Sequence, residues 1–113
     1  MSREYEVYVK EARRAKQYLD NYLEVAKEVK RVVVKLLPEA DVYVFGSVVE
    51  GKATPASDID ILVVAPETTL EERAVIRAEV VKKLDNPPVE LHFATPREYE
   101  NWYKRFVKKI VKI

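Results

Sequence analysis

The sequence contains no cysteine, no large excess of charge of either sign and no long hydrophobic run. Without cysteine it can form no disulfide, no thiolate nucleophile and no zinc site built on sulfur. Its uncharged stretches, such as residues 42–49, are far too short to span a bilayer. A formal net charge of +1 argues against a nucleic-acid or membrane-surface partner. Because the first residues include no apolar signal segment, we expect a cytoplasmic protein.

Length and composition indicate one globular domain. At 113 residues the chain can bury a single modest core, but not a core and a separate second domain. Apolar residues make up 48% of the sequence and charged residues 35%, which is typical of a folded protein with a heavily charged surface. We therefore expect one domain over residues 1–113, with a long N-terminal helix over residues 1–37 and a core over residues 38–113.

A regular apolar pattern runs through the N-terminal third of the chain. Apolar or small residues recur at alternating steps of three and four: Tyr5, Tyr8, Ala12, Ala15, Leu19, Tyr22, Ala26, Val29, Val33 and Leu36. This heptad spacing predicts a long helix that ends at Pro38, with a possible break at residues 20–21. A domain this small can cover only the C-terminal half of such a helix. We therefore expect the N-terminal half to contact a second chain, either another copy or a small helical partner protein.

The rest of the chain alternates between strands and helices. Three segments rich in β-branched and aromatic residues predict strands: Asp41–Phe45, residues 58–65 and Val89–Ala94. The resulting order is helix, strand, strand, helix, strand, helix, which predicts an α/β (α+β) fold.

Capping-box patterns mark the start of two helices. Thr68 and Thr69 each precede a glutamate by three residues, which predicts a helix to about residue 84. The residues expected on its buried face are Leu70, Ala74, Ala78, Val81 and Leu84. Thr95, followed by Pro96 and Glu98, predicts a last helix to the end of the chain. The residues expected on that buried face are Tyr99, Trp102, Tyr103, Phe106, Ile110 and Ile113.

The second predicted strand carries two carboxylates on one face. Alternate residues of a strand share a face, so Asp58 and Asp60 project together while Ile59 and Ile61 point into the core. Packing gives no reason for such a pair, because the charges repel each other and burial would raise their pKa values. A bound Mg²⁺ ion resolves this conflict, since it takes carboxylate ligands and leaves coordination positions for water and phosphates.

Two neighbouring features complete a candidate phosphate-transfer site. Gly46 and Ser47 follow the first strand, where glycine allows a phosphate to approach closely and the hydroxyl can donate a hydrogen bond. Glu90 lies on the third strand, on the same face as His92. If the third strand neighbours the second, Glu90 can reach the aspartates, help to hold a metal and accept a proton. We expect His92 to be a half-exposed strand residue that faces this site.

The same loop also contains the Gly-x4-Gly-Lys spacing of a P-loop, from Gly46 to Lys52. The next residue is Ala53, so the hydroxyl that binds the metal in a P-loop is absent. Pro55 and the Asp58 strand follow immediately, which leaves no helix N-terminus to receive a phosphate. We therefore reject a P-loop here.

The Gly46-Ser47 pair, ten intervening residues and Asp58-Ile59-Asp60 resemble the signature of the DNA polymerase β-like nucleotidyltransferases, in particular their minimal members. The resemblance covers residues 40–95 and implies that family's fold, a short mixed sheet flanked by helices. It implies transfer of a nucleoside monophosphate, AMP from ATP in the first instance, to a hydroxyl group. The implied catalytic residues and ligands of Mg²⁺ or Mn²⁺ are Asp58, Asp60 and Glu90. The residues implied at the nucleoside triphosphate are Gly46 and Ser47, and Lys52 and Ser57 are further candidates there.

The sequence departs from this family where many members carry arginine after the Gly-Ser pair. Val48, Val49 and Glu50 stand there, so Lys52 either supplies the missing charge or is an ordinary loop lysine. Small relatives often occur in toxin–antitoxin pairs, in which a tyrosine of a helical partner is nucleotidylated, and the resemblance implies such an acceptor. The alternative is a weakly catalytic or non-catalytic antitoxin or adaptor that neutralises a helical partner. A tRNA- or poly(A)-tailing enzyme is disfavoured by the near-neutral charge.

Overall fold

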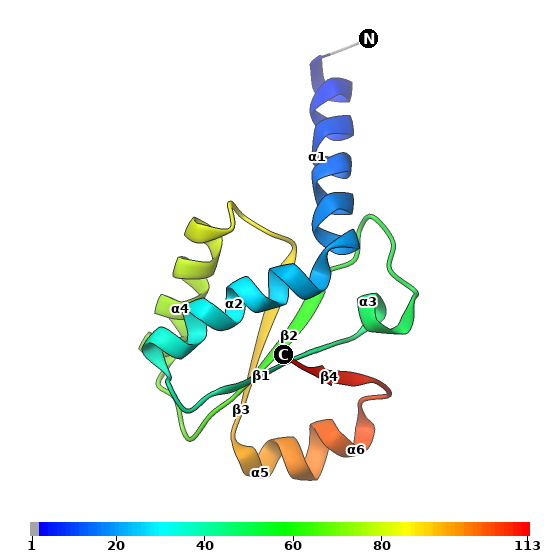
Figure 1. Ribbon diagram of the computed structural model, residues 1–113. Helices are drawn as coiled ribbons and strands as arrows, with labels where there is room; N and C mark the ends of the chain where they lie inside the picture. The colour runs from blue at the N-terminus through cyan, green and yellow to red at the C-terminus, as the bar shows by residue number, and fades with distance from the viewer. Residues whose placement is uncertain (1–2) are drawn as a thin grey trace.

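The computed structural model describes residues 3–113 and consists of a four-stranded mixed sheet with helices on both faces (Figure 1). The strands are β1 (Asp41–Phe45), β2 (Ile59–Val64), β3 (Val89–Ala94) and β4 (Ile110–Lys112). Their order in the sheet is β3-β2-β1-β4. The pairs β1–β2 and β1–β4 are antiparallel, whereas β2 and β3 are parallel. This arrangement confirms the α/β (α+β) class and the short mixed sheet.

The N-terminal helical region is divided into α1 (Arg3–Asp20) and α2 (Tyr22–Leu36). The break at Asn21 was one of the two alternatives that the sequence left open. There the backbone leaves the helical conformation, and the side-chain amide donates a hydrogen bond to the carbonyl of Gln17 at 2.8 Å. Helix α2 lies across the sheet, while α1 projects away from the rest of the molecule (Figure 1).

Two apolar clusters form, one on each face of the sheet. The larger one joins alternate residues of the strands, including Val42, Ile59 and Ile61, to α2 and to α4 (Leu70–Lys83). On the opposite face, Tyr43 and Leu62 belong to a smaller cluster. Tyr99 and Tyr103 pack against it from the π-helical turn η1 (Tyr99–Tyr103), which lies between α5 (Pro96–Glu98) and α6 (Lys104–Phe106). Because this cluster is small, it covers only part of the second sheet face, and polar side chains can occupy the rest.

Both helix starts predicted from capping boxes are confirmed. Thr69 accepts a hydrogen bond from the backbone N–H of Glu72 at 3.0 Å, and the Glu72 carboxylate accepts one from the Thr69 N–H at 2.9 Å. Thr95 and Glu98 form the same reciprocal pair at the start of α5. These local sequence patterns fix where α4 and α5 begin.

The Thr69 cap leads to a prediction for stability. Replacing Thr69 with alanine leaves the Glu72 N–H without its side-chain partner, and we expect a loss of about 1 kcal/mol. That loss should lower the melting temperature by about 4 °C in a calorimetric scan. Thr68→Ala is the matched control, because its hydroxyl accepts a hydrogen bond from the Arg73 side chain rather than from a backbone N–H at the start of α4. Equal losses in the two variants would contradict the assignment of Thr69 as the cap.

The buried face of α4 differs from the one that the sequence predicted. Ile76 and Val80 are its buried residues, whereas Leu70 is 81% exposed and Val81 is 50% exposed. Leu84, just beyond the helix, is the only predicted member that packs against the core. The prediction was wrong because the predicted buried face includes two alanines, whose small side chains bury little apolar surface. The larger side chains of Ile76 and Val80 remove more apolar surface from water.

The predicted last helix was too long. It ends at Phe106, Val107 is extended, and Ile110–Lys112 forms β4 along the outer edge of β1. Trp102 and Phe106, expected in the core, are 59% and 66% exposed. Pairing with β4 protects an edge of β1 that would otherwise be open, and this contact overrides the helical spacing near the C-terminus.

The heptad residues divide between the core and the surface. Ala26, Val29 and Val33 of α2 are fully buried, as expected for the C-terminal half of the pattern. Near the start of α1, Tyr5 is 53% and Tyr8 is 74% exposed. Within residues 3–113, no helix combines the length and the apolar character needed to cross a membrane.

Candidate functional site

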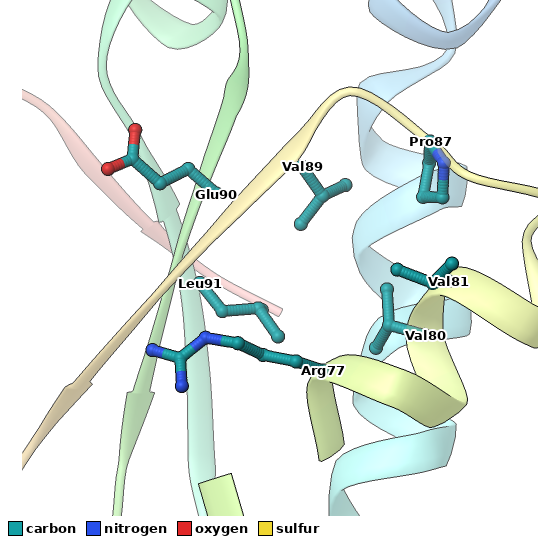
Figure 2. A pocket seen from close by; sticks show the side chains of 7 residues that line it. All are labelled: Arg77, Val80, Val81, Pro87, Val89, Glu90 and Leu91. Atoms are coloured by element: carbon teal, nitrogen blue, oxygen red, sulfur yellow. The ribbon is translucent and has the colours of Figure 1, made fainter. Parts of the chain in front are cut away.

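The candidate site begins with the parallel pairing of β2 and β3. In this register Asp60 is the direct neighbour of Glu90, so the strand adjacency required by the sequence argument is confirmed. Figure 2 shows Val89 and Leu91 directed towards α4, while Glu90 points to the other side of β3. Strand alternation therefore places the two carboxylates on the sheet face opposite the larger apolar cluster.

His92 joins these two acids. Its Nε2 lies 3.2 Å from Oδ1 of Asp60 and 3.9 Å from Oε1 of Glu90. One ligand atom from each of the three residues lies within 4.8 Å of the others. The Asp60 and His92 side chains are 24% and 28% exposed, whereas that of Glu90 is 58% exposed. The group is therefore partly shielded on one side and open to solvent at Glu90.

Gly46 presses against the Asp60 carboxylate. A Cβ atom built on Gly46 would lie only 2.2 Å from Oδ2 of Asp60. The Gly46 backbone, at φ 86° and ψ −159°, lies in a region that is essentially restricted to glycine. Both the space and the backbone therefore require glycine at this position, which links the turn after β1 to the acid on β2.

The remaining predicted residues surround this group. Ser47 is half-buried and begins the short helix α3 (Ser47–Glu50), which Val48 anchors in the core. Lys52 is exposed in the loop that follows. The Ser57 hydroxyl accepts a hydrogen bond from the Thr54 N–H at 2.8 Å and so helps to shape that loop.

Asp58 lies immediately before β2 rather than within it, and its side chain is exposed. The compact ligand group consists of Asp60, Glu90 and His92 and does not include Asp58. Asp58 is nevertheless two residues from Asp60, at the same end of β2. The structure thus brings Asp60, Glu90 and Gly46 together and leaves Asp58 at the open margin.

Aromatic side chains beside the site pack against one another and against His92. The Phe45 ring lies 5.1 Å from the His92 ring, between their centroids. Tyr43 stacks on Tyr99 at 4.6 Å, and burial, followed by its hydrogen bond with Tyr99, raises the pKa of Tyr43 to about 12. Burial likewise raises the pKa of Tyr103. Both phenols therefore stay neutral near pH 7, and the negative charge of this face comes from carboxylates.

A separate hollow of about 340 Å³ lies between α4 and β3 (Figure 2). Its lining is mainly apolar and includes Val80, Val81, Pro87 and Leu91. Arg77 also lines it, and the Arg77 guanidinium lies over the Phe93 ring at 5.0 Å. Glu90 also lines this hollow, but its carboxylate points to the other side of β3, so the hollow and the candidate site adjoin at Glu90.

The residues of the compact group are suitable ligands for a divalent cation. Carboxylate oxygens are the usual ligands of Mg²⁺ and Mn²⁺, and glycine allows the turn after β1 to lie directly against Asp60. The sequence predicted the acids and the glycine turn, but it gave His92 no part in the group. The only signal was strand alternation, which places His92 on the face of Glu90.

Comparisons with known proteins agree on one family. Residues 26–113 match the family model described as the nucleotidyltransferase domain. A candidate nucleotidyltransferase of known structure is 31% identical, with a TM-score of 0.60 over 77% of this chain and 95% of that one. Another, from Sulfolobus solfataricus, is 27% identical, with a TM-score of 0.61 over 87% and 84%.

A third similar structure is a toxin–antitoxin complex with AMP-PNP. It is 26% identical, with a TM-score of 0.49 over 60% of this chain and 56% of that one.

Proposed function

This chain belongs to the nucleotidyltransferase domain family, and from that premise we propose that it transfers AMP from ATP to a hydroxyl group of another molecule. The observation that carries the proposal is the pairing of Asp60 with Glu90 across β2 and β3, with Gly46 packed against Asp60. Acids that can hold a metal then lie beside a turn that can receive a triphosphate. Metal-assisted nucleotidyl transfer requires this combination.

In the proposed reaction, the acceptor oxygen attacks the α-phosphorus of ATP. A new oxygen–phosphorus bond forms, the bond to the β-phosphate oxygen breaks, and pyrophosphate leaves. Glu90 accepts the proton of the acceptor hydroxyl, because its carboxylate is the most exposed of the compact group. The Ser47 hydroxyl donates a hydrogen bond to the triphosphate, and Lys52 and Ser57 complete the nucleotide side of the site.

We assign the divalent cation, Mg²⁺ or Mn²⁺, to Asp58, Asp60 and Glu90. When bound, it neutralises the triphosphate and stabilises the charge that develops on the transferred group. Asp60 is fixed by strand pairing and by its contact with Gly46. Asp58 lies at the exposed margin, where its carboxylate can turn towards a metal–nucleotide complex.

The acceptor that we propose is a hydroxyl of a small helical partner protein, such as a tyrosine of a toxin. Helix α1 supports this choice, because it projects from the body and exposes Val7 and Tyr8 (Figure 1). The same face would suit a homodimer. Cross-linking through α1 followed by mass determination would identify either occupant.

A second candidate function is that of an adaptor or antitoxin with little or no turnover. It is favoured by Val48, Val49 and Glu50, which occupy positions where many family members place arginine. Fewer positive charges beside the triphosphate would weaken nucleotide binding.

Two experiments separate these functions. Incubation with Mg²⁺, ATP labelled on the α-phosphate and a cell lysate should transfer label to a macromolecule if the chain is an enzyme. Calorimetric titration with Mg-ATP should show binding by an enzyme. Absence of both labelling and Mg-ATP binding would contradict the enzymatic function and leave the adaptor.

A further inference from the structure

We propose that His92 is a direct ligand of the catalytic cation, so that the site is a mixed nitrogen–oxygen site that favours Mn²⁺ over Mg²⁺. The inference rests on the proposed function, since it concerns the metal of the same site. It goes further because the sequence pattern and the family signature assign only carboxylates.

The first argument is distance. With metal–ligand bonds of about 2.1 Å, adjacent ligand atoms of an octahedral ion are about 3.0 Å apart and opposite ones about 4.2 Å apart. Nε2 of His92 lies 3.2 Å from Asp60 and 3.9 Å from Glu90, and no pair in the group exceeds 4.8 Å. The three atoms therefore occupy separations that one ion can bridge with small side-chain adjustments.

The second argument is the orientation of the imidazole. The Phe45 ring packs against His92 from β1, and the register places His92 on β3 opposite Leu62 of β2. The ring is thereby held with Nε2 directed towards both carboxylates. A histidine that served only as a surface residue would need no such contact with two acids.

The third argument is ligand chemistry. Imidazole nitrogen suits transition metals, whereas Mg²⁺ prefers oxygen ligands alone. Replacing one oxygen with a neutral nitrogen also lowers the negative charge of the ligand set. The loss of charge weakens the binding of both ions, and the nitrogen ligand lowers the affinity for Mg²⁺ relative to that for Mn²⁺.

The chain offers a clean spectroscopic test because His92 is its only histidine. Mn²⁺ is added without nucleotide to an excess of the full chain, from which any polyhistidine tag has been removed. Pulsed EPR should detect the hyperfine coupling of a directly bound ¹⁴N. Labelling histidine with ¹⁵N should replace this signal, and His92→Gln should remove it.

Calorimetry with the metal ions alone gives an independent result. We expect His92→Gln to weaken Mn²⁺ binding by about tenfold or more, since loss of even an outer partner of a metal ligand commonly costs this much. Mg²⁺ binding should change far less. Glu90→Gln is the matched variant, because loss of an oxygen ligand should weaken the binding of both ions. Circular dichroism would verify that each variant is folded.

The outcomes separate the inference from the function on which it rests. Mn²⁺ bound without a ¹⁴N coupling, or unchanged Mn²⁺ affinity in His92→Gln, would overturn the ligand role. The second result would show that His92 only donates a hydrogen bond to Asp60, since glutamine can replace that donor. Neither result would contradict the proposed nucleotidyl transfer. Absence of any Mn²⁺ or Mg²⁺ binding, with or without ATP, would overturn both.

Discussion

Asp60→Asn is expected to abolish nucleotidyl transfer while leaving the fold intact. Asparagine keeps the shape of the side chain, and its carbonyl oxygen can still accept a hydrogen bond from His92. It removes the negative charge that holds the metal, and metal stabilisation of such a transition state is worth several kcal/mol. A loss of about 4 kcal/mol corresponds to a rate lower by roughly a thousandfold.

This loss would be measured as label transferred from ATP labelled on the α-phosphate, with melting curves recorded in parallel. Asp41→Asn is the matched control, because Asp41 lies in the same sheet but at the opposite end of β1. Asp41 forms an ion pair with the exposed Lys112 at 3.5 Å, away from the candidate site, so we expect full activity. Retention of activity by Asp60→Asn would refute the proposed site.

The second large effect is expected for Gly46→Ala. The added Cβ would lie 2.2 Å from Oδ2 of Asp60, and the backbone conformation strongly disfavours any other residue. The backbone alone should cost roughly 1–3 kcal/mol. The collision must also displace the Asp60 carboxylate, so both stability and transferase activity should fall. Denaturant unfolding and the labelling assay would measure the two losses.

Gly51 provides the comparison. It also has a positive φ, 73°, but no atom lies within 4 Å of a Cβ built there. Gly51→Ala should therefore lose about 1 kcal/mol from backbone strain and keep its activity.

A double-mutant cycle isolates the collision. In an Asp60→Ala background the Oδ2 atom is absent, so Gly46→Ala should destabilise the protein less than it does in the native chain. We expect a coupling of about 0.5–3 kcal/mol, the range typical of residues in contact. A coupling of zero would show that the requirement for Gly46 comes from its backbone alone.

The functional consequence of the fold is a division between the two sheet faces. One face is filled by α2, α4 and the larger apolar cluster, which makes the strands rigid. The other face is only partly covered by α5 and η1, and it carries Asp60, Glu90 and His92. The proposed ligands Asp60, Glu90 and His92 thus lie on paired strands, whereas Asp58 lies just before β2.

Some features of this protein follow from the sequence by itself. Capping boxes predicted two helix starts, one at Thr68 or Thr69 and one at Thr95, because these motifs depend on atoms only three residues apart. Period-two alternation placed Ile59 and Ile61 in the core and Asp60 on the other face. The spacing of the Gly-Ser pair and the aspartates was sufficient to indicate the family.

Other features were decided only by the tertiary structure. Strand order placed Glu90 beside Asp60, and no local pattern determines which strands become neighbours. The same pairing brought His92 to both carboxylates. Near the C-terminus, the apolar spacing of Ile110–Lys112 predicted a helix. These residues form a strand instead, because they pair with the outer edge of β1. Periodicity reports the faces of an element, but contacts between distant elements depend on how much surface each arrangement buries. The arrangement that buries the most apolar surface is therefore determined by the whole chain and not by any one segment.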